Sequence, residues 1–299
     1  MSNQNQDRLT RREFLKKSGI GAATLVTVGW PIDGSQPTAT RTPGSDDAQA
    51  ILIDLTRCTG CNACTLACKV SNRLAHPDVL AKQLDSDAYT FVDQRQVEKG
   101  DGQIETCFVK RQCMHCLDPA CVSACTVGAL SKTAAGPVVY DAHKCIGCRY
   151  CQYACPFGVP TYEWENALGL IHKCQMCVER LVAGQQPACV EACPNGALRF
   201  GKRAALLAQA HAQIISNPER YVDHVYGEHE AGGTSVLYLS AVPFAGLGLP
   251  ELDPEPIPHQ AEAVMKLTPY VALTVASIAT ALHWILQRRE LKVDTGENQ

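Results

Sequence analysis

Residues 58–68 decide the fold: they read CTGCNACTLAC and place Cys58, Cys61, Cys64 and Cys68 within eleven residues. The same C-x2-C-x2-C-x3-C spacing returns at residues 145–155, in Cys145, Cys148, Cys151 and Cys155. Two residues between successive cysteines let a tight loop wrap one small metal centre. The cysteine three residues further on lies on the following helical turn and points away. Each run can therefore give three thiolates to one centre and a fourth to another.

Two further groups of cysteines have a wider spacing. Between the two runs, C-x2-C-x4-C-x3-C comprises Cys113, Cys116, Cys121 and Cys125. After the second run, C-x2-C-x11-C-x3-C comprises Cys174, Cys177, Cys189 and Cys193. In chain order we call them group one (58–68), group two (113–125), group three (145–155) and group four (174–193). Sixteen of the seventeen cysteines fall in these groups, which suffices for four sites of four thiolates.

The spacing favours iron–sulfur clusters over zinc and over disulfides. Structural zinc is commonly held by two separate C-x2-C pairs, whereas a crowded run that ends in Cys-Pro, as at Pro156, is the bacterial ferredoxin spacing. In such runs the last cysteine ligates a different cluster, so clusters are expected in crossed pairs that share two groups. Cysteines so closely spaced make poor disulfides, although an exported chain rich in cysteine normally suggests them. All sixteen group cysteines are thus predicted iron ligands of four 4Fe-4S clusters.

Other residues near the groups are interpreted as supporting ones. Cys107 lies in an apolar stretch that predicts a strand leading into group two, and lone cysteines commonly behave as small hydrophobic residues. It is therefore predicted to be a buried structural thiol. His115, His143 and His172 lie close to group cysteines, but with sixteen thiolates none is needed as a ligand. We interpret them as loop residues that tune cluster potentials through hydrogen bonds.

The N-terminal part predicts export. With a net charge of −3 and 46% hydrophobic residues among 299, the chain has room for a globular body and a membrane element, and no basic excess for nucleic acid. In residues 1–30, Arg11 and Arg12 precede Phe-Leu-Lys and a weakly apolar stretch, which is typical of a twin-arginine signal for proteins exported already folded. Residues 31–49 are rich in Ser, Thr, Pro, Gly and Asp and predict a flexible linker.

The body expected at residues 50–201 is internally repeated. A strand at 51–55 leads through Asp54 into group one, and a strand at 138–140 leads through Asp141 into group three. The phrase CVSACTVGAL, from Cys121, matches CVEACPNGAL, from Cys189, so groups two and four also correspond. The predicted fold is α+β, with two tandem ferredoxin-like dicluster domains whose cysteine groups interleave.

The C-terminal part predicts a membrane anchor. Residues 202–249 are expected to form an extension with a helix at 202–216 and a strand at 234–240, and the prolines of residues 250–266 a stiff connector. Residues 267–286 carry no formal charge and span about 30 Å as a helix, enough to cross a bilayer core. A buried core helix is the alternative. Basic residues in the tail 287–299 place that tail in the cytoplasm and the body outside.

Taken together, these features resemble the four-cluster iron–sulfur β subunits of membrane-bound, periplasm-facing oxidoreductases. The resemblance covers residues 51–201 and is most specific in the cysteine groups. The twin-arginine start, residues 112–119 (QCMHCLDP), residues 226–240 (YGEHEAGGTSVLYLS) and the single C-terminal helix are most similar to the HybA-type subunit of uptake NiFe hydrogenases. The respiratory formate dehydrogenase β subunit is next, through a phrase similar to residues 182–190 (VAGQQPACV). One departure is Thr126, where many relatives have proline.

The resemblance implies a ligand assignment. Cys58, Cys61 and Cys64 would take Cys193 as fourth ligand, and Cys174, Cys177 and Cys189 would take Cys68. Cys113, Cys116 and Cys121 would take Cys155, and Cys145, Cys148 and Cys151 would take Cys125. The resemblance also implies that the first domain lies nearer a catalytic subunit and the second nearer the membrane.

The predicted function is electron transfer through four 4Fe-4S clusters. The expected partners are a periplasmic catalytic subunit of NiFe hydrogenase type and a membrane cytochrome b or quinone-reducing subunit, with a formate dehydrogenase or other molybdenum or tungsten oxidoreductase as the alternative. We find no nucleotide loop, nucleophile elbow or compact acid–base site in the sequence, so catalysis by the chain alone is not expected. A zinc-stabilised membrane scaffold and a self-sufficient cluster enzyme are the alternatives from other classes.

Overall fold

The computed structural model describes residues 47–98, 102, 104–166 and 169–294. The predicted export signal and nearly all of the predicted linker lie outside these residues. The described elements are, in chain order, β1 (Gln49–Asp54), η1 (Leu55–Arg57), α2 (Ala63–Ser71), β2 (Phe91–Glu98), β3 (Ile104–Arg111), α3 (Ala120–Ser123), β4 (Leu130–Lys132), β5 (Val138–Tyr140), η2 (Ala142–Lys144), α4 (Tyr150–Ala154), β6 (Thr161–Tyr162), β7 (Ile171–His172), α5 (Val178–Val182), α6 (Ala188–Glu191), β8 (Leu198–Lys202), α7 (Arg203–Ser216), η3 (Glu230–Gly232), β9 (Val236–Leu239), η4 (Phe244–Leu247) and α8 (Ile257–Asp294).

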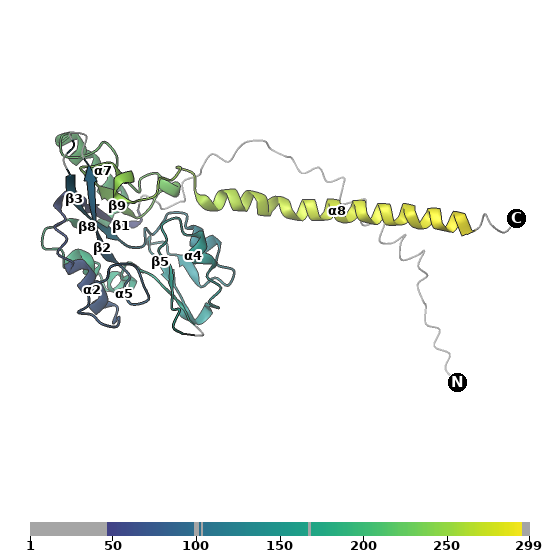
Figure 1. The fold of residues 1–299 in the computed structure, drawn as a ribbon, viewed down its shortest axis with the longest axis horizontal. Coiled ribbons are helices and arrows are strands. Elements are labelled where there is room, and N and C mark those ends of the chain that lie inside the picture. The colour runs from purple at the N-terminus through teal and green to yellow at the C-terminus, as the bar shows by residue number, and fades with distance from the viewer. Residues whose placement is uncertain (1–46, 99–101, 103, 167–168, 295–299) are drawn as a thin grey trace. The chain divides into compact units, whose positions relative to one another are not determined.

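A three-stranded sheet with the order β8-β1-β9 organises the body (Figure 1). Its central strand β1 pairs antiparallel with β8 and parallel with β9. Because side chains alternate along a strand, Ile51 and Ile53 enter one apolar core while Ala50 and Leu52 enter a second core against α7. β1 is therefore buried on both faces, and the predicted strand at 51–55 begins two residues early, at Gln49.

The four cysteine groups are distributed over two halves of the body. The flanking half carries group one between η1 and the end of α2 and group four around α5 and α6, and it contains the β8-β1-β9 sheet. The inserted half, residues 113–172, carries group two around α3 and group three around η2 and α4. Its strands form the two-stranded pairs β4-β5 and β6-β7. The predicted α+β fold with interleaved cysteine groups is confirmed.

The sequence repeat is visible in how each run of cysteines begins. Asp54 ends β1, and its Oδ1 accepts a hydrogen bond from Thr56 N at 3.1 Å at the start of η1. Asp141 follows β5, and its Oδ1 accepts from His143 N at 3.0 Å at the start of η2. An aspartate that caps the following turn thus delivers the chain into group one and into group three in the same way.

The connector after the body is docked on it. Tyr226 donates its hydroxyl to Pro250 O at 2.7 Å, and Ala231 N donates to Asp253 O at 2.9 Å. A Cβ on Gly232 would lie 2.5 Å from Pro256 Cγ, so the two chains approach as closely as glycine allows. The predicted stiff spacer at 250–266 is thus held against the body and is helical from Ile257 onwards.

α8 is longer than the predicted membrane segment. It runs from Ile257 to Asp294, and residues 267–287 are long and apolar enough to cross a membrane, with none of them buried by other described residues. Pro258 lies in its first turn, where the missing N–H has no helical partner to lose. The helix can therefore begin among prolines and continue into the predicted tail.

Candidate metal centre

The group cysteines lie in four clusters of thiols, each drawn from two groups. Each set is defined by thiols that lie close enough together for one to change the pKa of another. Set A comprises Cys58, Cys61, Cys64 and Cys193. Set B comprises Cys68, Cys174, Cys177 and Cys189, which together line one enclosed cavity. Set C comprises Cys113, Cys116, Cys121 and Cys155. Set D comprises Cys125, Cys145, Cys148 and Cys151.

The sets follow one another in a single order. Cys64 of set A lies near enough to Cys68 of set B to raise the pKa of Cys68, and Cys113 of set C likewise raises the pKa of Cys174 of set B. The third link joins Cys121 of set C to Cys151 of set D. Sets A and B belong to the flanking half, and sets C and D belong to the inserted half. The contact between Cys174 and Cys113 joins the two halves. The order A–B–C–D therefore runs through the body from one half to the other.

The two ends of this series are open to solvent. Cys61 in set A and Cys148 in set D are exposed, whereas the other group cysteines are buried or partly buried. All seventeen cysteines are free thiols, so no disulfide framework is present.

The backbone has the same turn in all four groups. The residue before the second cysteine has a positive φ in each: Gly60 (71°), His115 (48°), Gly147 (68°) and Met176 (55°). Such left-handed residues turn successive N–H groups toward one point and form the anion-binding concavities found at iron–sulfur sites. His115 and Met176 carry side chains in a conformation that costs about 1–3 kcal/mol and is common at functional sites. The turn is therefore a feature of the site, independent of glycine.

Backbone and side-chain donors already point at the sulfur atoms. Ala129 N lies 3.2 Å from Cys125 Sγ, Met176 N lies 3.3 Å from Cys174 Sγ, and Gly147 N lies 3.4 Å from Cys145 Sγ. Asn72 donates its side-chain amide to Cys68 Sγ at 3.5 Å. Donors on sulfur stabilise the thiolate and are one of the means by which a protein sets a cluster's potential.

Burial makes these thiols depend on a cation. It raises the pKa of Cys68 and of Cys121 to about 12 each, and it raises the pKa of Cys116 and of Cys174 well above the ordinary thiol value. In each case the neighbouring thiols raise the pKa further, because thiolates repel one another. Such groups become thiolates only when a cation shares the site, so cofactor binding and folding are coupled.

The donor set fits cubane clusters better than single metal ions. Among the described residues, no three Cys, His, Asp or Glu side chains converge closely enough to hold one ion. A cubane spreads its four ligands over four corners and therefore needs thiols that surround a space, as those of set B surround their cavity. This arrangement argues against zinc bound by the same cysteines.

Buried donors next to the cysteines lack partners that cluster sulfur would supply. Thr65 Oγ1, Gln112 Nε2 and His115 Nε2 are buried and have no hydrogen-bond partner within the described part of the chain. His115 Nδ1 accepts from Val138 N at 2.9 Å, which leaves the proton on Nε2. Each of the three residues directly adjoins a group cysteine in sequence. Sulfur atoms of bound clusters would satisfy these otherwise costly donors.

The other predicted supporting residues differ from one another. His143 is exposed. His172 is partly buried, and its Nδ1 lies 3.3 Å from the Tyr89 hydroxyl. Of the three histidines, His115 is the one that is fully buried. Cys107 is on β3, as predicted, but it is only partly buried at the edge of the main apolar core. Side chains alternate between the two faces of a strand, and in a two-stranded pair some of these positions stay only half-covered.

Buried lysines next to the thiols were missed by the sequence reasoning. Lys110 is 1% exposed and Lys173 is 3% exposed, and Lys132 is partly buried beside set C. Burial lowers the pKa of Lys132 to about 8, although Cys116 and Cys113 act in the opposite direction. No signal in the sequence distinguishes Lys110, which looks like an ordinary strand lysine between Val109 and Arg111.

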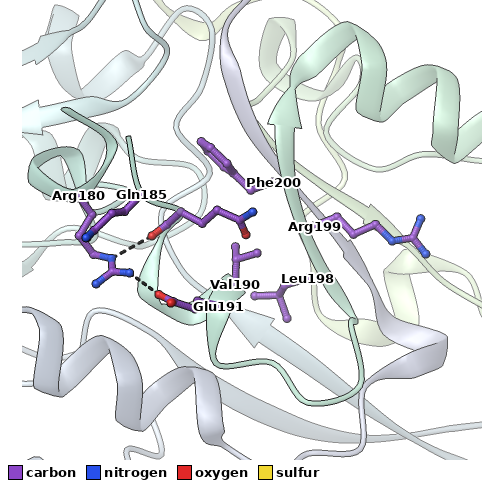
Figure 2. A pocket seen from close by; sticks show the side chains of 8 residues that line it. Arg180, Gln185, Val190, Glu191, Leu198, Arg199 and Phe200 are labelled. Carbon is purple, nitrogen blue, oxygen red and sulfur yellow. Dashed lines mark hydrogen bonds and ion pairs between the residues drawn. The ribbon is translucent and has the colours of Figure 1, made fainter. Parts of the chain in front are cut away.

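One surface hollow is separate from the thiols. Figure 2 shows it between the α5–α6 loop and β8, lined by Arg180, Gln185, Gln186, Val190, Glu191, Leu198, Arg199 and Phe200. Arg180 Nε donates to Gln186 O at 2.9 Å, and its guanidinium pairs with Glu191. The charge of Arg180 is thus paired within the hollow, and the eight lining side chains include no thiol or imidazole.

Comparison with known proteins agrees with this site. The family model of the 4Fe-4S dicluster domain matches residues 104–203, which include groups two, three and four. A protein of Nitratidesulfovibrio vulgaris strain Hildenborough, whose name states no function, is 41% identical over 295 residues, covering 94% of this chain and 78% of that protein.

Two relatives with informative names cover different lengths. The hydrogenase-2 operon protein HybA of Escherichia coli O157:H7 is 35% identical over 322 aligned positions, covering 96% of this chain and 97% of that protein. The iron–sulfur subunit of the nitrate-inducible formate dehydrogenase of Escherichia coli K12 is 37% identical over 199 residues, covering 64% of this chain and 67% of that subunit. The chain therefore belongs to the HybA-like family of 4Fe-4S dicluster iron–sulfur subunits, which is related to the iron–sulfur subunits of formate dehydrogenases.

Proposed function

We propose that this chain is the electron-transfer subunit that joins a periplasmic catalytic subunit of NiFe hydrogenase type to a membrane cytochrome b or quinone-reducing subunit. The observation that carries the proposal is the order of the thiol sets, A–B–C–D, with exposed cysteines only in the terminal sets. Such a series has two accessible ends and a buried middle. It suits one-electron transfer between two partners better than chemistry on a bound substrate.

In this proposal each thiol set holds one 4Fe-4S cluster. The proposed iron ligands are the members of sets A, B, C and D as defined above. When bound, the clusters supply one-electron oxidation and reduction. The chain's own residues hold the thiolates at fixed separations, donate hydrogen bonds to sulfur and exclude water from sets B and C.

The terminal sets are the proposed points of electron entry and exit. Cys61 brings set A to the surface of the flanking half, and Cys148 brings set D to the surface of the inserted half. His259, at the start of α8, lies 3.1 Å from Asp118, which lies two residues before α3 of the inserted half. This contact supports an arrangement in which set D serves the membrane partner and set A the catalytic partner.

We also propose the domain organisation and location that the sequence predicts. Residues 1–30 would direct export by the twin-arginine route, residues 31–49 would form a linker and residues 50–201 the four-cluster body. Residues 202–249 would form an extension, 250–266 the connector, 267–286 the membrane span and 287–299 a cytoplasmic tail. The apolar segment 267–287 and the basic residues after it support an anchor with the body on the periplasmic side.

The nature of the catalytic partner has two candidates. Similarity to HybA along nearly the whole of both chains favours a hydrogenase. Similarity to formate dehydrogenase iron–sulfur subunits over 64% of this chain makes a molybdenum or tungsten enzyme the second candidate.

Metal analysis of the complex tests the proposal. The complex would be purified anaerobically in mild detergent, and iron, nickel, molybdenum, tungsten and zinc counted per chain. We expect about sixteen irons in this subunit, four for each cubane, with nickel in the partner. Molybdenum or tungsten in place of nickel would favour the second candidate, and zinc without iron would overturn the proposal.

Two serine variants provide the matched control. Cys177→Ser removes a set B thiol, whereas Cys107→Ser changes a partly buried cysteine outside all four sets. We expect the first to lose the signal of one cluster and the second to keep the full iron content. Equal iron loss in both variants would contradict the assignment of ligands.

A further inference from the structure

Lys110 places a positive charge deep inside the flanking half. Its side chain is 1% exposed and forms part of the wall of the cavity enclosed by the set B cysteines. Its Nζ donates to Thr90 Oγ1 at 2.8 Å and to Gln112 Oε1. No Asp or Glu pairs with Lys110 among the residues that the structure describes. A buried ammonium without a carboxylate is costly, so another negative charge must compensate it.

The compensating charges are the thiolates. Lys110 lines the same cavity as Cys68, Cys174, Cys177 and Cys189, which are all four thiols of set B. Cys64 of set A is a further thiol that lies near enough to act on the charge of Lys110. The charge therefore acts mainly on set B.

Set D offers a contrast within the same chain. The cavity that Lys110 lines with the set B thiols includes none of the set D cysteines. Set D also includes the exposed Cys148, where water can screen charge. Sets B and D thus each have four thiols, but Lys110 shares its cavity with set B alone.

We propose that Lys110 is a fixed buried cation that raises the reduction potential of the set B cluster and, to a smaller extent, that of the set A cluster. The inference rests on the proposed assignment of one cluster to each set. Reduction adds one electron to a cluster and moves no proton in this scheme. The neighbouring cluster that gives the electron is oxidised by the same amount. A nearby positive charge stabilises the more negative, reduced state, and net charge is one determinant of cluster potential.

The consequence is that the electron resides preferentially on the set B cluster, inside the body. A higher potential at set B makes the electron stay there longer than at exposed ends, where water screens charge. Thr90 and Gln112 hold the ammonium in place, because both accept hydrogen bonds from it. Thr90 Oγ1 is itself fixed, since it donates to Arg111 O at 2.7 Å. The charge cannot swing to solvent, unlike that of a surface lysine.

The test is a redox titration of the intact complex followed by electron paramagnetic resonance. The variants are Lys110→Met, which removes the charge, Lys110→Arg, which keeps it, and Lys202→Met as a surface control. Lys202 pairs with Asp47 at 2.8 Å, and its side chain is 69% exposed. The set B signal is assigned as the one lost in Cys177→Ser, and the iron content is measured in every sample.

We expect Lys110→Met to reduce the ratio of reduced to oxidised set B cluster at a fixed potential about tenfold, which is a shift of about −59 mV for one electron. Set A should shift less and set D not at all. Lys110→Arg and Lys202→Met should keep the wild-type potentials. A purely structural role for Lys110 would lower thermal stability without moving set B relative to set D.

Other outcomes overturn the inference in distinguishable ways. Four cluster signals in the wild type with unchanged set B potential in Lys110→Met would overturn it and leave the proposed function intact. Absence of four clusters in the wild type would instead overturn the proposed function. If Lys110→Met does not assemble, Lys110→Gln, which can still bond to Thr90, takes its place with the same expected shift. Iron loss in both neutral variants, with full iron in Lys110→Arg, would assign the charge to assembly and overturn the inference.

Discussion

The two halves of the body carry the same cysteine turns but are supported differently. In the flanking half, β1 lies between β8 and β9 and is buried against two apolar cores, one on each face. In the inserted half, two-stranded pairs enclose a small core whose buried members are Cys121, Leu130, Val138, Cys151 and Ile171. Isolated two-stranded pairs are only marginally stable in water. The turns around the cysteines are thus alike in the two halves, whereas the packing that stabilises each half differs.

The comparison predicts that the inserted half depends on its clusters for folding. Its core includes two proposed iron ligands, so apolar contact and metal binding are the same interaction there. The main core of the flanking half also contains two proposed ligands, Cys64 and Cys189, but most of its members are aliphatic or aromatic, and the second core against α7 contains no cysteine. Losing a cluster should therefore open one half and only loosen the other.

The largest effect is expected from cysteine variants at equivalent positions. Cys64 and Cys151 are the third cysteines of the two runs, and both are 7% exposed. We expect Cys151→Ser to increase amide exchange in β4, β5, β6 and β7 by at least roughly tenfold, as local opening predicts. Cys64→Ser should leave β1, β8 and β9 protected. Hydrogen exchange with mass spectrometry on the purified complex measures both.

Either of two results would break this comparison. Equal opening of β1 in Cys64→Ser would mean that the apolar cores do not support the flanking half without its clusters. Full protection of β4 and β5 in Cys151→Ser would mean that the small core suffices for the inserted half. The iron content of each variant shows that a cluster was in fact lost.

A smaller effect should follow from removing matched isoleucines. Ile53 is at 0% exposure in the main core and Ile171 at 2% in the core of the inserted half. Ile→Ala in a core costs about 2–5 kcal/mol, and more where the surroundings cannot collapse into the cavity. Ile53→Ala should lie near the upper end, because β1 is held on both sides by strands, and Ile171→Ala near the lower end. Urea unfolding of the cluster-loaded protein, followed by circular dichroism, gives the two midpoints.

Ile215 supplies the control for this pair. It is 79% exposed on α7, so Ile215→Ala should change the unfolding free energy by no more than about 0.5 kcal/mol. A larger loss for Ile171→Ala than for Ile53→Ala would reverse the proposed ranking of the two cores.

The cysteine spacing was informative because it is a local property. The runs at 58–68 and 145–155 predict a tight turn and a departing fourth thiol, and the positive φ at Gly60 and Gly147 shows that turn. Spacing could not say which group shares ligands with which, because that depends on how β1 and β8 come together. The neighbours in sets A to D are compatible with the sharing that the family resemblance implies, and the ligand assignment itself stays a prediction.

Features that depend on distant packing could not be read from the sequence. Lys110 looks like an ordinary strand lysine until Thr90, the residue just before β2, lies beside it and the set B thiols close around it. The prolines at 250–258 look like a free spacer until Gly232 and Tyr226 contact them. In both cases the partner lies far away in the chain. Periodicity and spacing describe only near neighbours.

The smallest effect should come from the two aspartates that begin the cysteine runs. Asp54 is 2% exposed: its Oδ1 accepts from Thr56 Oγ1 at 2.6 Å, and its Oδ2 accepts from the Tyr221 hydroxyl at 2.9 Å. Asp54→Ala would leave the buried Tyr221 hydroxyl unsatisfied and should cost about 1–3 kcal/mol. Among the described residues, the Asp141 carboxylate contacts His143 N and the exposed Lys144, so water can replace it and Asp141→Ala should shift the urea midpoint far less. Equal shifts would mean that the cap itself, rather than its tie to the C-terminal extension, accounts for the stability of both runs.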